Sequence, residues 1–194
     1  MSAFTAAVFR NDRKNYRVSD PDPTNLSGEQ ALDGRARVDG VTLGAGGNIL
    51  DNWAISANYA YLDSEVLQGA SKYSAGIGQD YTKGDRLLNV PKHSFSLWTT
   101  YQLSFGLQLG YGATYQGEMY VAQHSSTNPN GPLATASGYT VHRLMAGYAF
   151  TDSFDLQLNI NNVLDKEYYT RIRNNGWATP GEGRLFILSA NYSF

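Results

Sequence analysis

The sequence lacks cysteine, long apolar runs and any marked excess of charge. No segment approaches the roughly 18 consecutive apolar residues that suggest a membrane-spanning helix. The formal net charge of -2, without a basic run, argues against nucleic-acid binding, so no nucleic acid is expected among the partners. The absence of cysteine leaves the compartment open, because periplasm-exposed proteins can carry disulfides without requiring them.

Proline is also scarce, with 6 residues, whereas glycine and tyrosine are abundant, with 20 and 14 residues. The mean hydropathy of -0.39 would by itself indicate a soluble protein. A transmembrane barrel gives similar values, because its strands alternate lipid-facing with lumen-facing residues. The tyrosine and glycine content favours a β protein with girdles of aromatic side chains.

The C-terminal segment alternates between apolar and polar residues. Counting back from the end, the two sets are Phe194, Tyr192, Ala190, Leu188 and Phe186, and Ser193, Asn191 and Ser189. This period of two predicts a strand with one apolar and one polar face. An outer-membrane barrel needs such a final strand, since every strand edge in lipid must be paired. The segment therefore indicates a membrane protein.

Eight strand-like segments follow one another along the chain, at residues 2–18, 35–49, 53–66, 92–103, 107–116, 138–150, 154–161 and 183–194. The turns at 50–52, 104–106 and 151–153 are short, whereas the connections at 19–33, 67–91, 122–137 and 172–182 are long and polar. Outer-membrane barrels alternate short periplasmic turns with long extracellular loops in this way. We therefore predict an all-β fold, an antiparallel transmembrane β-barrel segment of about eight long strands.

Residues 1–10 contain no secretory signal, because they lack a basic start, an apolar core and a small-residue cleavage site. An outer-membrane protein needs an export signal to reach its membrane. Either Met1 is therefore an internal start of a longer protein, or the membrane interpretation is wrong, and the motifs described below favour the first.

The residues that could support catalysis or hold a metal are dispersed. His93, His124 and His142 are far apart in sequence, with no HxxxH spacing and no cysteine partner, and are interpreted as ordinary strand or loop histidines. Asp63 and Glu65 lie on one face of a strand, but nothing marks them as an acid/base pair. No Ser/His/Asp grouping, P-loop or dinucleotide-binding glycine motif occurs. We therefore expect no enzyme, no metal site and no cofactor.

One C-terminal motif resembles the penultimate-strand motif of TonB-dependent outer-membrane receptors. It consists of Asn162, two apolar residues, Asp165, Lys166, one further residue and Tyr168. Residues 37–43 resemble a strand motif that lies earlier along the sequences of this family. The match is less close, because Thr42 stands where a Glu is common.

A second motif resembles the C-terminus of the same family. It contains Gly181 and Arg184 in a Pro-Gly-Glu-Gly-Arg segment, followed by the alternating strand that ends at Phe194. The resemblance covers the whole chain, 1–194, but only the C-terminal part of such a receptor. It implies the last eight strands of a 22-stranded barrel, without the plug domain. Alone, the chain would therefore be unable to transport.

The resemblance also implies a function and partners. Residues 61–65 and 177–181 resemble receptors for ferric siderophores, the catecholate kind among them. The expected location is the bacterial outer membrane, in contact with lipid and lipopolysaccharide. TonB would act only through the plug domain that is missing here, and the barrel-assembly machinery would engage the terminal strand. The ferric siderophore would be the transported ligand.

Polar and aromatic residues of the predicted outer loops are the candidate ligand contacts. They are Tyr73, Tyr81, Tyr120, His124, Arg171, Arg173 and Trp177. A ferric siderophore is often a bulky, anionic, aromatic complex, so cationic groups and aromatic faces would hold it. The alternative is that the aromatic residues form the interfacial girdle and the arginines contact lipopolysaccharide phosphates.

Two other interpretations remain open from the sequence. The first is a free-standing eight-stranded outer-membrane barrel with a structural or adhesive role, because eight is an allowed strand number and a filled interior needs no plug. The second is a soluble lipocalin-like barrel or β-sandwich that binds a ligand. That protein would need apolar residues inside and a polar exterior.

Overall fold

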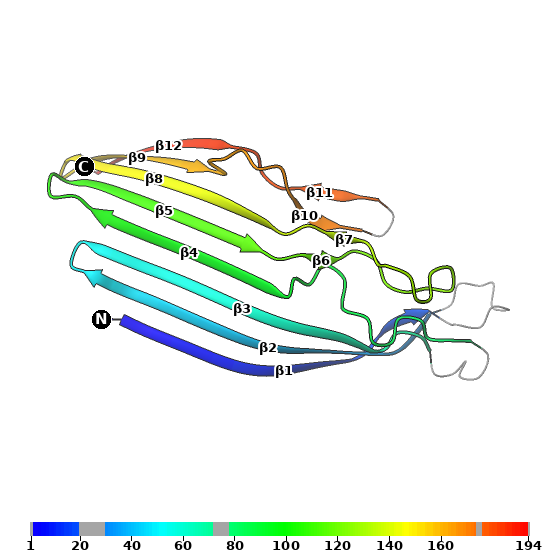
Figure 1. Ribbon diagram of the computed structural model, residues 1–194. Coiled ribbons are helices and arrows are strands. Elements are labelled where there is room, and N and C mark those ends of the chain that lie inside the picture. Colours follow the sequence, from blue (N-terminus) through cyan, green and yellow to red (C-terminus); the bar gives the residue numbers. More distant parts are fainter. Residues whose placement is uncertain (1, 20–29, 72–77, 174–175, 194) are drawn as a thin grey trace.

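A computed structural model describes residues 2–19, 30–71, 78–173 and 176–193 of the chain. Within these ranges every regular element is a β-strand (Figure 1). None of the described residues belongs to a helix long and apolar enough to cross a membrane. The predicted all-β class is therefore confirmed.

Eight long strands form one antiparallel sheet in the order β1-β2-β3-β4-β5-β8-β9-β12. Their bounds are β1 Ser2–Ser19, β2 Gln30–Leu50, β3 Trp53–Gln68, β4 His93–Gln102, β5 Leu107–Gln116, β8 Tyr139–Thr151, β9 Phe154–Asn161 and β12 Leu185–Tyr192. Two small hairpins are separate: β6 (Met119–Tyr120) pairs with β7 (Thr135–Ala136), and β10 (Tyr169–Ile172) pairs with β11 (Ala178–Pro180). Each strand of the large sheet thus pairs with the next long strand along the chain.

The connections alternate as predicted. The turns between β2 and β3, β4 and β5, and β8 and β9 are short and lie at one end of the sheet, where the described ends of the chain also lie (Figure 1). The turn from β4 to β5 needs Gly106, whose φ of 95° is strained for a residue with a Cβ atom. The described parts of the long connections lie at the opposite end, hereafter the loop end (Figure 1).

The structure corrects some boundaries of the sequence prediction. β2 begins at Gln30 rather than at residue 35, so the connection expected at 19–33 is shorter. The connections expected at 122–137 and 172–182 contain the small strands β7 and β11, which are too short to show a periodic pattern. The polar loops are therefore more ordered than the sequence indicates.

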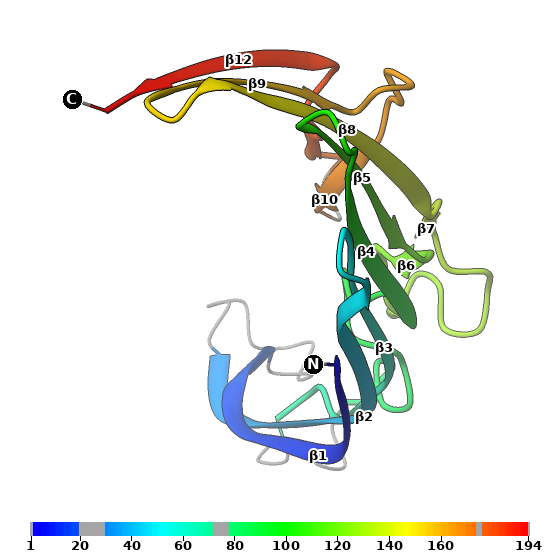
Figure 2. The ribbon, with the colours of Figure 1, turned by 90° about the vertical axis from the view of Figure 1, so that its left-hand side faces the viewer.

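The large sheet is an open, curved wall (Figure 2). β1 and β12 are its two edges, and no ladder joins them in the described ranges. A closed eight-stranded barrel is therefore not what this chain forms in the structure.

One face of the sheet, hereafter the apolar face, carries large apolar side chains in register across the strands. One row is Ile55, Thr99, Tyr111, Leu144, Ile160 and Phe186, and the next is Trp53, Tyr101, Leu109, Ala146, Leu158 and Leu188. Eight of these twelve side chains are exposed, with 61% for Phe186 and 69% for Leu188, and the other four are half-buried. A soluble lipocalin-like barrel would bury them inside, so that interpretation is wrong.

The opposite face, hereafter the glycine-rich face, carries mainly small and polar residues, with a few large side chains such as Trp98, Met145 and Ile187. The Trp98 ring lies across Gly110 and Gly112 of the neighbouring strand, and the Arg143 guanidinium lies 5.8 Å from its centroid. A Cβ atom at Gly112 would come within 2.7 Å of that ring. Small side chains on one face and large ones on the other favour curvature toward the small side.

This packing predicts that Gly112→Ala destabilises the folded sheet by about 1–3 kcal/mol, because Trp98 must move away from its position. Urea unfolding, followed by the loss of the compact form on gels without boiling, measures the change. The matched control is Gly46→Ala, whose added Cβ meets only a backbone oxygen at 3.9 Å. Equal midpoints for the two variants would contradict the packing role of Gly112.

Candidate ligand-binding site at the loop end

Six of the seven ligand residues predicted from the sequence lie in the described part of the chain. They are Tyr81, Tyr120, His124, Arg171, Arg173 and Trp177, and all belong to segments at the loop end (Figure 1). Tyr73 lies outside the described residues. Tyr81 begins the turn at residues 81–84 and is half-buried.

A small hydrophobic core joins two of these segments. Met119, Val121 and Ala136 are buried together around the β6–β7 hairpin, and Ile172 of β10 packs against them. The alternation along β10 then leaves Arg171 and Arg173 exposed on the other side. The core therefore fixes which side chains of the β10–β11 hairpin reach solvent.

Asn89 links three loop segments through one residue. Its backbone N–H donates to the Tyr120 carbonyl at 2.9 Å, and its Oδ1 accepts a hydrogen bond from the Ile172 N–H at 3.0 Å. Its φ of 58° is left-handed, a conformation that Asn tolerates better than most residues. No local sequence pattern predicts this role, because the partners of Asn89 lie far away along the chain.

His124 is held by the buried carboxylate of Asp85. Its Nδ1 lies 2.6 Å from Asp85 Oδ1, and its backbone N–H donates to Asp85 Oδ2 at 2.7 Å. This contact occupies Nδ1, so only Nε2 of His124 is left for a ligand. Asp85 was not among the predicted site residues.

Arg86 adds a cationic group that the sequence prediction missed. Its guanidinium lies 5.6 Å from the centroid of the Tyr120 ring, and its carbonyl accepts a hydrogen bond from Gln123 Nε2 at 3.0 Å. Within the described ranges, Nε and Nη2 of Arg86 have no hydrogen-bond partner. Tyr120 therefore supports a cation, and its direct contact with a ligand stays a prediction.

The β10–β11 hairpin presents the most accessible predicted residues. The Arg173 N–H donates to the Trp177 carbonyl at 2.8 Å, and this hydrogen bond joins the two sides of the hairpin. Trp177 is 73% exposed, and Arg171 and Arg173 are also exposed. Two guanidinium groups and an indole are thus available on one short hairpin to an anionic, aromatic ligand.

Asn162, the first residue of the family-like motif, is a buried structural residue rather than a ligand contact. Its Nδ2 donates to the carbonyls of Lys166 at 3.0 Å and Glu182 at 2.9 Å, and its Oδ1 accepts from the Lys166 N–H at 2.8 Å. It is only 2% exposed and has a φ of 48°. Asn162 therefore joins the two arms of the chain at the base of the β10–β11 hairpin.

The remaining motif residues complete this joint, hereafter the basal clasp. Asp165 Oδ1 accepts the Arg184 N–H at 2.9 Å, and the two side chains form an ion pair at 3.7 Å. The Gly181 N–H donates to the Tyr168 carbonyl at 2.8 Å, and the Tyr168 ring fills the space where a Cβ of Gly181 would lie. Lys166 contributes its backbone, while Phe194 lies outside the described residues.

Metal ligands do not gather anywhere in the described residues, since no three His, Asp or Glu side chains could hold an ion together. The loop end instead offers exposed cations and aromatic rings on a framework of hydrogen bonds. Such a surface suits reversible binding of a charged ligand. The ligand role of each predicted residue remains a prediction.

The basal clasp predicts that Asn162→Ala lowers the free energy of unfolding by about 3 kcal/mol, because two carbonyls and one N–H lose their buried partner. Chemical unfolding measures the stability, and limited proteolysis between residues 162 and 184 measures the local opening. Asn191→Ala is the control, because it removes only an exposed hydrogen bond to Asp155. An Asn162 variant as protease-resistant as this control would contradict the clasp.

Comparison with known proteins identifies the family. Residues 1–163 match the model of the TonB dependent receptor-like β-barrel. The chain is 37% identical over 195 residues to the probable TonB-dependent siderophore receptor PiuA of Acinetobacter baumannii. It is 31% identical over 191 residues to the catecholate siderophore receptor Fiu of Escherichia coli K12. Both alignments cover 98% of this chain.

Solved structures agree with these alignments. The crystal structure of PiuA superposes with a TM-score of 0.80 over 98% of this chain and 26% of that protein. The closed form of Fiu superposes with a TM-score of 0.75 at 30% identity, over the whole of this chain and 25% of that protein. The chain thus spans about a quarter of the length of these relatives. It belongs to the family of TonB-dependent receptors and has the fold of their β-barrel wall.

Proposed function

We propose that this chain is part of the barrel wall of an outer-membrane receptor that takes up a ferric siderophore. The observation that carries the proposal is the exposed group of Arg171, Arg173 and Trp177 on a clasped hairpin at the loop end. The siderophore receptors among the relatives support it. Residues 1–194 are assigned to the barrel, and the chain acts in transport rather than as an enzyme.

The apolar face supports placement in a membrane. β5 has 10 residues, and a tilted membrane-spanning strand needs about 9–11. Toward the loop end of β1 and β2 the apolar side chains give way to two ion pairs, Arg10–Asp39 and Arg37–Asp12, each at 2.7 Å. The hydrogen bond from Arg37 lowers the pKa of Asp12, and that from Arg10 lowers the pKa of Asp39. These charges mark the water boundary, where lipopolysaccharide headgroups would lie.

The chemistry of the hairpin suits a ferric siderophore of the catecholate kind. Guanidinium groups pair with the negative charge of such a complex, and an indole stacks on its rings. The siderophore is the cargo, so the receptor needs no resident cofactor. Nε2 of His124 is a further polar group on the loop framework.

The proposal includes two further partners. TonB would act through a plug domain outside this chain, which fills the interior against the glycine-rich face. The barrel-assembly machinery would engage the terminal strand, β12. This strand has alternating apolar and polar residues and pairs with β9 over eight residues.

The hairpin predicts that the double variant Arg171→Glu/Arg173→Glu binds a ferric catecholate siderophore at least about tenfold more weakly, because two attractive charges become repulsive. Quenching of tryptophan fluorescence in the purified full receptor measures the affinity. Arg35→Glu, which reverses an exposed charge on β2, is the control. Equal affinities for the double variant and the control would remove these arginines from the binding site.

A further inference from the structure

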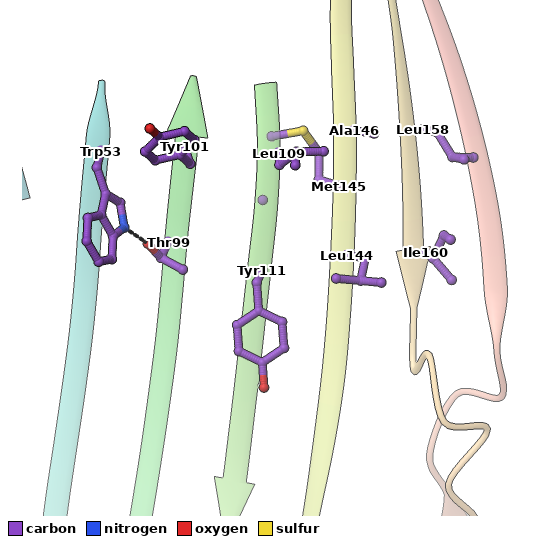
Figure 3. Close-up of a pocket in the computed structure, with 11 residues that line it drawn as sticks. Trp53, Thr99, Tyr101, Leu109, Tyr111, Leu144, Met145, Ala146, Leu158 and Ile160 are labelled. Carbon is purple, nitrogen blue, oxygen red and sulfur yellow. Dashed lines mark hydrogen bonds between the residues drawn. The ribbon is translucent and has the colours of Figure 1, made fainter. Parts of the chain in front are cut away.

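Arg143 places a positive charge on the glycine-rich face at a fixed position. Leu144, the next residue of β8, lines a groove of about 660 Å³ on the apolar face, where none of the eleven lining residues is charged (Figure 3). Because side chains alternate along a strand, Arg143 points to the opposite face. Its guanidinium lies 5.8 Å from the centroid of the Trp98 ring, which Gly110 and Gly112 allow to lie close to β5. The packing of three strands, β4, β5 and β8, therefore sets the position of this cation.

The cation has no anionic partner in the described part of the chain. The exposed Arg143 side chain forms no ion pair or hydrogen bond with another described residue, and the facing residue on β9 is Asn161. Asp155, the carboxylate on the same face of β9, lies six residues along that strand, a distance of about 20 Å. It already accepts a hydrogen bond from Asn191 Nδ2 at 2.9 Å. The Trp98 ring supports the charge but offers no oxygen to the guanidinium donors.

Uncharged polar groups lie beside this cation on its loop side. A hollow of about 350 Å³ includes Asn58, Ser96 and Thr114, which pair across β3, β4 and β5 two residues from the Trp98 row. Asn58 and Thr114 are exposed, so their amide and hydroxyl groups are accessible. One positive charge beside several hydrogen-bonding groups is complementary to a polypeptide segment that carries an acidic side chain.

We propose that Arg143 binds a carboxylate of the plug domain, and that the backbone beside this carboxylate lies against the hollow of Asn58, Ser96 and Thr114. The proposal rests on the proposed function, which places a plug domain against the glycine-rich face. In open water such an ion pair contributes little. A domain that fills the interior excludes water, and Arg then binds a carboxylate through two parallel hydrogen bonds. Loss of one partner leaves the other charge buried and unpaired, which is strongly unfavourable.

Photocross-linking in the full receptor identifies the partner of this surface. Thr114→p-benzoylphenylalanine places a photoreactive group in the hollow and leaves Arg143 unchanged. Mass spectrometry is expected to find a cross-linked plug-domain peptide that contains Asp or Glu. Cross-links to barrel peptides alone would overturn the proposal.

Charge reversal then measures the contact. Arg143→Glu should raise the rate at which thermolysin releases plug-domain peptides in intermediate urea at least about tenfold, because two negative charges then face each other. Replacement of the cross-linked carboxylate by Arg in the same variant should restore the wild-type rate. Lys92→Glu is the matched control, since the Lys92 ammonium also lies over a ring, 5.4 Å from the Tyr61 centroid, but on the apolar face.

Fluorescence quenching by the ferric siderophore separates this contact from the proposed function. A receptor that binds the siderophore normally, and whose Arg143→Glu variant releases plug peptides at the wild-type rate, overturns the contact and leaves the function intact. The wild-type release rate together with slower siderophore uptake would assign Arg143 to the passing anion and would also overturn the contact. A receptor with no affinity for a ferric siderophore overturns the function, while the cross-link still identifies the partner of the hollow. Each variant is first checked for folding by its compact migration on gels without boiling.

Discussion

The structure depends on the pairing of backbone N–H and C=O groups between neighbouring strands. In an apolar environment an unpaired group costs several kcal/mol, so each strand must run beside another along its whole apolar length. The six inner strands meet this demand on both sides, with ladders that keep residues in register from β3 to β12, whereas β1 and β12 each pair on one side only in the described ranges. The same register gathers the large side chains into rows on one face. The pairing of the strands and the rows of large side chains on the apolar face are therefore consequences of a single constraint.

At the loop end this constraint no longer applies. There, side-chain hydrogen bonds connect the segments in place of pairing between strands. Asn89 joins three segments, Asp85 holds His124 through two contacts, and Asn162 closes the base of the β10–β11 hairpin. These groups are short, polar and partly buried, so each hydrogen bond is shielded from competing water. The loop end thus obtains its order from a few residues rather than from periodic pairing.

This difference explains what could be predicted from the sequence. The alternation of β5 and the short turn before it are local signals, and both elements were found where expected. Asn89 and Ile172 are 83 residues apart, and no local pattern shows that they meet. Asn162 and Asp165 were recognised as a motif, but their role became clear only when Glu182 and Arg184 were seen opposite them. The described loop residues therefore lie at the end of the sheet where the sequence placed them, while the framework that holds them was missed.

The basal clasp also bears on how the hairpin would bind a ligand. Contacts run without interruption from Asn162 and Glu182 through Tyr168 and Gly181 into the β10–β11 ladder. An arm fixed along this length loses little conformational entropy when it meets a ligand, whereas a free loop would pay that cost on binding. In the proposed binding mode, the exposed arginines and Trp177 would thus be held in position by residues that do not contact the ligand themselves. The motif is therefore best understood as a structural support for the β10–β11 hairpin, which explains why it contains a buried amide and a glycine under an aromatic ring.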